Sequence, residues 1–257
     1  MIFVDTHAHL YDDQFDTDRS AIIQRSVDAG VTRIYLPNCD SSTIDIMLDV
    51  EHQWPQHCFA MMGLHPVYVK DNYEEELAIV KQWLDKRVFS AIGEIGLDKY
   101  WDLTHIEQQK KAFAQQIHWA LELNLPIVIH SRESTPDCID MVKAEGKGVK
   151  GIFHCFSGTV EEAKEIIDLG MYLGIGGVAT FKKSALPDII KAIGINNLVL
   201  ETDAPYLAPV PYRGKRNESS YIPLVANAIS NALAMPVAEV ARITTANAEK
   251  VFGKPIE

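Results

Sequence analysis

Two histidines near the start of the chain have the spacing of a metal-binding pair. His7 and His9 lie in the segment Asp5-Thr6-His7-Ala8-His9. If this segment ends a strand, alternate side chains share a face, so both imidazoles point the same way. Two imidazoles so placed can hold one divalent cation. An isolated His-x-His pair is more often structural, so the interpretation needs further ligands.

Further residues of ligand type follow apolar runs, as residues at strand ends do. Glu94 ends SAIGE, His130 ends PIVIH, His154 ends KGIFH, and Asp203 follows NLVLET. Each of them alone could be a capping group or a polar group satisfied inside the core. Packing requirements do not readily explain six such residues at the ends of five predicted strands. The predicted metal ligands are His7, His9, Glu94, His130, His154 and Asp203.

The number of ligands favours two divalent cations over one. A single catalytic zinc ion keeps three protein ligands and one open position, whereas this set has four histidines and two carboxylates. Glu94 is the best placed to bridge two ions, and Asp203 could accept a proton from a water molecule as a general base. Magnesium, manganese and zinc all remain open as the native metal, because imidazole and carboxylate ligands are mixed.

The elements that must position these residues alternate along the chain. Short apolar runs predict strands, and amphipathic segments between them predict helices. We expect strands near 2–5, 31–36, 58–62, 89–93, 125–130, 150–154, 171–175 and 197–202. We expect helices near 16–29, 41–53, 73–86, 104–123, 135–145, 159–169, 184–193 and 220–233, with an additional helix near 236–250.

This alternation predicts a parallel α/β fold. Eight strands, each followed by a helix, in 257 residues is the layout of a (β/α)₈ TIM barrel, in which ligands gather where the strands end. A doubly wound open sheet is the rival architecture. Because the ligand-type residues fall at strand ends, we favour a single barrel domain over residues 1–257.

Composition limits the class of protein. A net charge of −11 argues against a protein that coats nucleic acid, because non-specific DNA binding relies on a basic surface. It does not exclude an enzyme that grips one phosphodiester through bound cations. The sequence has no signal peptide or long apolar run, and its four cysteines lack paired spacing. We therefore expect a cytoplasmic protein, monomeric and without a membrane partner, whose cysteines are buried thiols.

Other polar residues are candidates for contacting a substrate. His65 follows the third predicted strand and could donate to a phosphate or leaving oxygen, or merely cap the strand. Arg132 could reach an anionic substrate, or pair with Glu133. A long loop after the last strand carries the dense basic cluster Tyr212, Arg213, Lys215 and Arg216, which suits stacking on a base and holding phosphate. Its alternative is a solvated charged loop.

The ordered set of motifs resembles the TatD family of metal-dependent deoxyribonucleases. The motifs are DTHAHL at 5–10, GLHP at 63–66, GEIGLD at 93–98, PIVIHSRE at 126–133, HCFSG at 154–158, ETDAPYLAP at 201–209 and PYRGKRNE at 211–218. The resemblance implies an amidohydrolase-like barrel with a binuclear site. It also implies that His7, His9 and Asp203 hold one metal, that His130 and His154 hold the other, and that Glu94 bridges. The implied activity is magnesium-assisted hydrolysis of DNA, often from the 3′ end.

Two departures from the family pattern fall in loops rather than on predicted ligands. Lys99 stands after GLD where the family commonly has an aromatic residue, and Ser219-Ser220 follows RGKRNE where proline is common. Both bear on substrate choice.

Two other functions remain open from the residues alone. The same site could hydrolyse a small amide, a lactone or an aminoacyl ester, because chemistry belongs to the site rather than to the barrel. A non-enzymatic barrel with structural polar residues is the third hypothesis.

Overall fold

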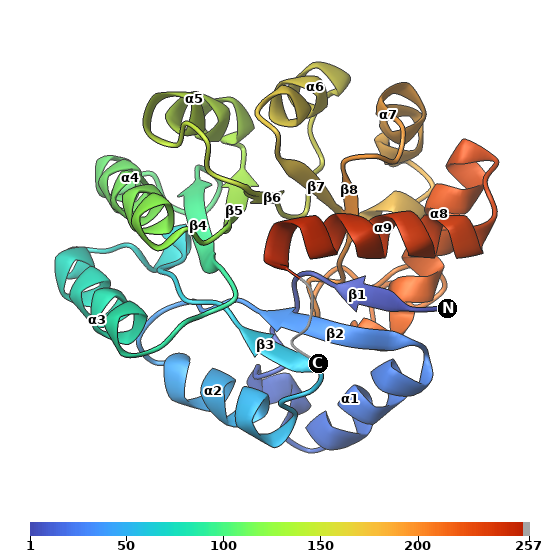
Figure 1. Ribbon diagram of the computed structural model, residues 1–257, viewed down its shortest axis with the longest axis horizontal. Coiled ribbons are helices and arrows are strands. Elements are labelled where there is room, and N and C mark those ends of the chain that lie inside the picture. The colour runs from blue at the N-terminus through green and yellow to red at the C-terminus, as the bar shows by residue number, and fades with distance from the viewer. Residues whose placement is uncertain (254–257) are drawn as a thin grey trace.

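The computed structural model describes residues 1–253 and shows a ring of parallel strands surrounded by helices (Figure 1). The strands are β1 (Phe3–Asp5), β2 (Val31–Leu36), β3 (Cys58–Ala60), β4 (Ile92–Asp98), β5 (Ile127–Arg132), β6 (Gly151–Phe153), β7 (Tyr172–Ile175) and β8 (Leu198–Leu200). The helices are α1 (Arg19–Asp28), α2 (Ile44–Gln53), α3 (Tyr73–Lys86), α4 (Ile106–Leu123), α5 (Thr135–Glu145), α6 (Val160–Asp168), α7 (Leu186–Ile193), α8 (Ile222–Leu233) and α9 (Val237–Phe252).

The strands close into a barrel. Regular pairing joins β1-β2-β3 and β4-β5-β6-β7-β8, always parallel. Bridges between Met62 and Ile92 and between Ala8 and Ala204 complete the ring at the two remaining joints. An open sheet would leave two unpaired edges, so these bridges confirm the barrel and exclude the doubly wound alternative.

The strands form as predicted because both of their faces are buried. Val4, Tyr35, Val128 and Val199, from four different strands, meet in one apolar cluster, while a second, larger cluster fills the space between strands and helices. Strands buried on both sides have few positions for polar residues until the strand ends. Polar side chains are therefore concentrated near the strand ends and in the loops that follow.

The fourth strand differs from the sequence prediction. It was expected near 89–93 with Glu94 at its end, but β4 runs Ile92–Asp98, so Glu94 lies inside it. All seven residues are buried, and the strand stays paired with β5 as far as Arg132. The glycines and the acidic residues in IGEIGLD obscured this strand. Most other bounds differ from the prediction by three residues or fewer.

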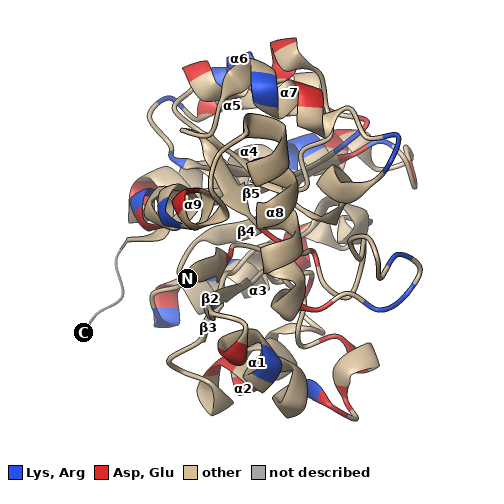
Figure 2. Ribbon diagram, turned by 90° about the vertical axis from the view of Figure 1, so that its right-hand side faces the viewer, with Lys and Arg blue, Asp and Glu red and all other residues tan. Residues whose placement is uncertain are grey.

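Helix α9 covers the N-terminal end of the barrel. It packs against β1 and β8, its last residue Phe252 stacks on Tyr35 with ring centroids 3.8 Å apart, and Arg33 pairs with Glu249 at 3.0 Å. Figure 2 shows α9 and the N-terminus on one side and charged loops on the opposite side. The opposite side is the C-terminal mouth, where barrel enzymes place their chemistry.

Other expectations concern membrane segments and cysteines. Within residues 1–253, no single helix is long and apolar enough to span a membrane, although the bent pair Ser219–Leu233 and Val237–Phe252 passes by length and composition. The four cysteines are free. Cys58 and Cys138 are buried as expected, but Cys39 and Cys155 are only half-buried, because both lie beyond strand ends, near the mouth.

Candidate metal centre

The polar side chains at the C-terminal mouth converge on Glu94, which rises from inside β4. This carboxylate is almost fully buried. Its two oxygens face different groups of residues: Oε2 points to the histidines that follow β1, and Oε1 points to one histidine in β5 and to histidines that follow β3 and β6. The structure therefore brings the six predicted ligands together as two sets that share one carboxylate.

The first set gathers around Glu94 Oε2. His7 Nε2 lies 3.0 Å and His9 Nε2 3.6 Å from this oxygen, and the two imidazole nitrogens are 3.3 Å apart. Asp203 Oδ1 is 3.8 Å from His7 Nε2 and 3.6 Å from His9 Nε2. Asp203 has a left-handed backbone (φ 57°), a conformation that aspartate tolerates better than most residues.

The second set gathers around Glu94 Oε1. His130 Nδ1 lies 2.9 Å, His154 Nε2 3.2 Å and His65 Nε2 3.3 Å from this oxygen. His65 differs from the other two, because its Nδ1 accepts a hydrogen bond from the backbone N–H of Val67 at 3.1 Å. Its pKa is lowered by burial, so the neutral ring carries its proton on Nε2 and is a hydrogen-bond donor toward the centre.

The donor atoms fit divalent cations. Donors bound about 2.1 Å from a tetrahedral ion lie about 3.4 Å from one another, and the atoms around Glu94 Oε2 are separated by 3.0 to 3.8 Å. Oε2 is buried without a hydrogen-bond partner, which is costly unless a cation satisfies it. Three overlapping groups of these residues have donor atoms close enough to hold an ion.

Residues behind the ligands hydrogen-bond to two of the imidazoles and lie next to a third. Asp98 Oδ2 accepts from His130 Nε2 at 2.8 Å, the Tyr11 hydroxyl lies 2.9 Å from His9 Nδ1, and Glu201 Oε1 lies 3.4 Å from His154 Nδ1. Such partners keep the other ring nitrogen directed at the metal. Because Glu201 shares a strand face with Asp203, the sequence predicts it for this task; Asp98 and Tyr11 were not predicted.

The two-residue period of a strand could have identified Asp98. Glu94, Gly96 and Asp98 alternate along β4, whereas Tyr11 lies in a turn after β1, where no strand period applies. Asp5 shares a strand face with His7, so the sequence predicts that it orients this ligand. Its carboxylate instead accepts from Thr202 N at 3.0 Å and Thr202 Oγ1 at 2.6 Å, across the joint between the first and last strands. Burial raises the pKa of Asp5 to about 7.

The carboxylates and the histidines of the centre shift each other's pKa values. Burial disfavours the charged form of Glu94, but the surrounding histidines outweigh burial and hold the pKa of this carboxyl well below its usual value. Burial also opposes charge on His154, yet Glu94 and Glu201 raise its pKa well above normal. The pKa of His7 is lowered by burial and by His154. The cluster thus attracts positive charge, as a cation site must.

The candidate substrate residues each have their own contacts within the protein. Arg132 does not pair with Glu133; its guanidinium carbon lies 3.8 Å from the Tyr100 ring centroid. In the long loop, Tyr212 stacks on Tyr221 with centroids 4.3 Å apart, and the Arg213 guanidinium lies 4.3 Å from the Phe181 ring. Lys215 is exposed.

Arg216 is held by the protein itself. It donates to Asp18 Oδ2 at 2.6 Å and lies over the Phe15 ring. Its loop is further anchored by buried Asn217, whose Nδ2 donates to the carbonyls of Thr202 and Tyr206 at 2.8 and 2.7 Å. Arg216 therefore has a structural partner that a substrate phosphate would have to displace.

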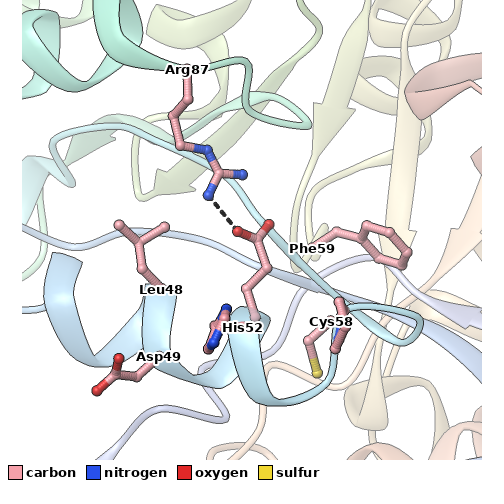
Figure 3. Close-up of a pocket in the computed structure, with 8 residues that line it drawn as sticks. Leu48, Asp49, His52, Cys58, Phe59 and Arg87 are labelled. Carbon is pink, nitrogen blue, oxygen red and sulfur yellow. Dashed lines mark hydrogen bonds and ion pairs between the residues drawn. The ribbon is translucent and has the colours of Figure 1, made fainter.

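A surface hollow of about 480 Å³ lies elsewhere, between α2 and the start of β3 (Figure 3). An ion pair between Arg87 and Glu51 crosses it at 2.5 Å, and Glu51 also accepts from Ala60 N at 2.7 Å. The charged groups of this hollow are therefore already paired with each other. The hollow lies where α2 leads into β3, and none of the predicted ligands lines it. The hollow is no part of the metal centre.

Comparisons with known proteins agree with the geometry. The sequence profile described as "TatD related DNase" matches residues 4–253. The chain is 42% identical to the uncharacterized metal-dependent hydrolase YabD of Bacillus subtilis, covering 98% of this chain and 99% of the relative. It is 30% identical to a protein of Pantoea ananatis named 3′-5′ ssDNA/RNA exonuclease TatD, with 97% and 98% covered.

A solved structure confirms the architecture. The crystal structure of YjjV, a TatD homologue from Escherichia coli K12, superimposes with a TM-score of 0.92 at 28% identity and 98% coverage of both chains. This chain belongs to the TatD family of metal-dependent hydrolases.

Proposed function

We propose that this hydrolase is a nuclease that cleaves phosphodiester bonds at the ends of DNA strands, with two divalent cations held in the candidate metal centre. The observation that carries the proposal is the arrangement around Glu94, whose two oxygens each face a separate set of donors. A two-cation site suits in-line displacement at phosphorus, because both the attacking and the leaving oxygen develop negative charge.

The residues divide the work of binding the cations. His7, His9 and Asp203 would hold one ion, His130 and His154 the other, and Glu94 would bridge them. When bound, the ions would polarise the phosphodiester and lower the pKa of a water molecule. Magnesium, manganese and zinc are all compatible with this donor set.

Asp203 is placed to take a proton from the attacking water. Burial opposes its ionisation, but the neighbouring His9, His154 and His7 outweigh burial and lower its pKa, so it is a carboxylate that can accept a proton. Its side chain is 16% exposed, whereas that of Glu94 is 2% exposed. Water therefore reaches Asp203 more readily than it reaches the bridging carboxylate.

His65 is placed to stabilise the phosphate or leaving oxygen. Its Nε2–H faces the same space as His130, with the two ring centroids 4.5 Å apart. A neutral donor there adds a hydrogen bond without competing for a cation. Arg132, Tyr212, Arg213, Lys215 and Arg216 remain candidates for contacting the strand. The Pantoea relative, named as a 3′-5′ exonuclease, supports cleavage from the 3′ end.

The test is nuclease activity in a ligand variant and a matched control. Replacing His154→Ala should lower magnesium- or manganese-dependent degradation of single-stranded DNA by at least about 100-fold, since even the loss of a residue that only orients a metal ligand costs about 10 to 100-fold. His118→Ala is the control, because this histidine is half-exposed on α4 and pairs with Glu145 at 2.9 Å. Circular dichroism should show that both variants are folded.

Substrate choice and direction are read in the same assay. Oligonucleotides labelled at the 3′ or at the 5′ end should give the ladder of a 3′ exonuclease. Unchanged DNA turnover by His154→Ala would contradict the proposal. A wild type that hydrolyses an aminoacyl ester or a lactone but no oligonucleotide would show that the same centre acts on a different bond.

A further inference from the structure

Exposed aromatic side chains stand beside the metal centre in the loop after β4. Tyr100 is 50% exposed and Trp101 is 65% exposed. They are consecutive, and their rings meet edge to face with centroids 5.0 Å apart. Contiguous apolar groups left in water commonly mark a binding surface.

The guanidinium of Arg132 lies over both rings and adds a positive charge to this surface. Its guanidinium carbon is 3.8 Å from the Tyr100 centroid and 5.2 Å from the Trp101 centroid. Among residues 1–253 it forms no ion pair with a carboxylate. A guanidinium that rests on aromatic rings keeps its outward donors for an anion. We name Tyr100, Trp101 and Arg132 the aromatic platform.

The aromatic platform is tied to the metal centre by one carboxylate. Asp98 Oδ1 accepts from the backbone N–H groups of Tyr100 and Trp101 at 2.9 and 3.0 Å. The other oxygen of Asp98 accepts from His130 Nε2 at 2.8 Å. Arg132 follows His130 by two residues on β5 and pairs in register with Asp98. The position of the platform is therefore fixed relative to a candidate metal ligand.

We infer that the aromatic platform holds an unstacked base of a single-stranded nucleic acid while Arg132 holds an adjacent phosphate. Aromatic rings stack on any base, and guanidinium groups bind the backbone, so the combination suits single strands without reading sequence. A duplex keeps its base faces covered, and a small ester offers no base at all. This inference rests on the proposed function and narrows its substrate to strands whose bases are exposed.

Binding of a cleavage-resistant ligand tests the platform. Fluorescence anisotropy of the manganese-loaded protein with a phosphorothioate single-stranded oligonucleotide should show about tenfold weaker binding for Trp101→Ala, the scale expected for one stacked base. Trp101→Phe, which keeps a ring, should retain most of the affinity. Val88→Ala is the matched control, because Val88 is an apolar residue 81% exposed in the segment before β4, away from the mouth.

An oligonucleotide with abasic residues separates stacking from damage to the fold. The difference between wild type and Trp101→Ala should shrink to less than about twofold on this ligand, because no base is left to stack. An equal loss on both ligands, or no loss on either, would overturn the inference.

Cleavage of an ordinary oligonucleotide tests the proposed function separately. If the wild type cleaves but Trp101→Ala binds normally, the platform is wrong and the nuclease stands. If the wild type binds in a base-dependent way and cleaves nothing, the nuclease is wrong and the platform stands. A wild type that neither binds nor cleaves overturns both.

Discussion

At the residue scale, Glu94 is the negative charge around which the histidines of the site gather. A buried carboxylate next to several imidazoles is stable only while positive charge is present, supplied either by protons or by cations. In the metal-free protein the charge resides on histidines such as His154, whose raised pKa arises against burial from Glu94 and Glu201. Metal and protons therefore compete for the same groups.

This competition predicts how pH changes stability. A histidine with a raised folded pKa stabilises the fold fully below its unfolded value of 6.5, and the contribution is lost as pH rises through the folded pKa. The metal-free protein should therefore have a lower melting temperature at about pH 8 than at about pH 6. Each ligand proton that manganese displaces should tighten its apparent binding about tenfold per pH unit over this range.

Differential scanning fluorimetry with and without manganese measures both effects. The shift in melting temperature on adding the metal should grow from about pH 6 to about pH 8. The His118→Ala variant should behave as wild type, because His118 is on the outer surface. A metal-induced shift that stays the same at every pH would show that the cation binds elsewhere.

Residue types and their positions at strand ends were enough to predict which ligands converge. They did not predict which nitrogen of each imidazole donates or accepts a hydrogen bond. The sequence identifies His65 and His130 alike as histidines after strands. Only their contacts separate them: His65 Nδ1 accepts from a backbone N–H, whereas His130 donates from Nε2 to Asp98. Likewise, nothing in the basic cluster of the long loop indicated that Arg216 is paired with Asp18.

At the scale of elements, β7 supports the centre without supplying a ligand. Gly174 lies where a side chain would meet Glu201: an added Cβ would be 2.1 Å from Glu201 Oε2. Glu201 accepts from Cys155 N at 2.5 Å and faces His154 Nδ1 at 3.4 Å. A glycine inside a strand commonly marks such a close approach.

Replacing Gly174→Ala should push Glu201 away from His154. We expect a loss of about 1 to 3 kcal/mol in the free energy of unfolding from overpacking, and manganese binding weakened by about 10 to 100-fold. Urea denaturation and calorimetric titration measure the two. Gly176→Ala is the matched control, because its Cβ would have no neighbour closer than 3.6 Å. Equal effects in both variants would argue against the contact with Glu201.

The alternation of strands and helices was predictable from periodicity, whereas some boundaries were not. The capping box of Thr159 and Glu162 begins α6 as a local signal should. The strand β4 was misplaced because Gly93, Gly96 and Glu94 are poor strand formers by composition. Their conformation is imposed by pairing with β5, a contact between distant segments that no local window contains.

At the scale of the whole molecule, residues that stabilise the fold and residues that can do chemistry lie at opposite ends of the barrel. The metal centre lies at the C-terminal mouth, and α9 seals the opposite end (Figure 2). Because none of the candidate ligands among residues 1–253 lies at the sealed end, we expect residues there to influence activity only by unfolding the barrel.

Asn247 of α9 tests this separation. Its buried side-chain amide donates to the carbonyls of Ile195 and Leu198 at 3.2 and 2.9 Å, which join the loop before β8 to the helix. Asn247→Ala should lower the free energy of unfolding by about 1 to 3 kcal/mol, because buried acceptors lose their donor. kcat/KM on DNA should stay within about twofold of wild type at temperatures where the barrel is folded.

Urea unfolding and initial rates, measured on the same preparations, show whether Asn247 affects stability alone or activity as well. Asn231→Ala, on the exposed face of α8, should change the free energy of unfolding by less than about 0.5 kcal/mol. If Asn247→Ala lowered kcat/KM while circular dichroism and the melting curve showed an intact barrel, the ends would be coupled through the strands. Coupling would then be sought along β8, since this strand contacts α9 and leads to Asp203.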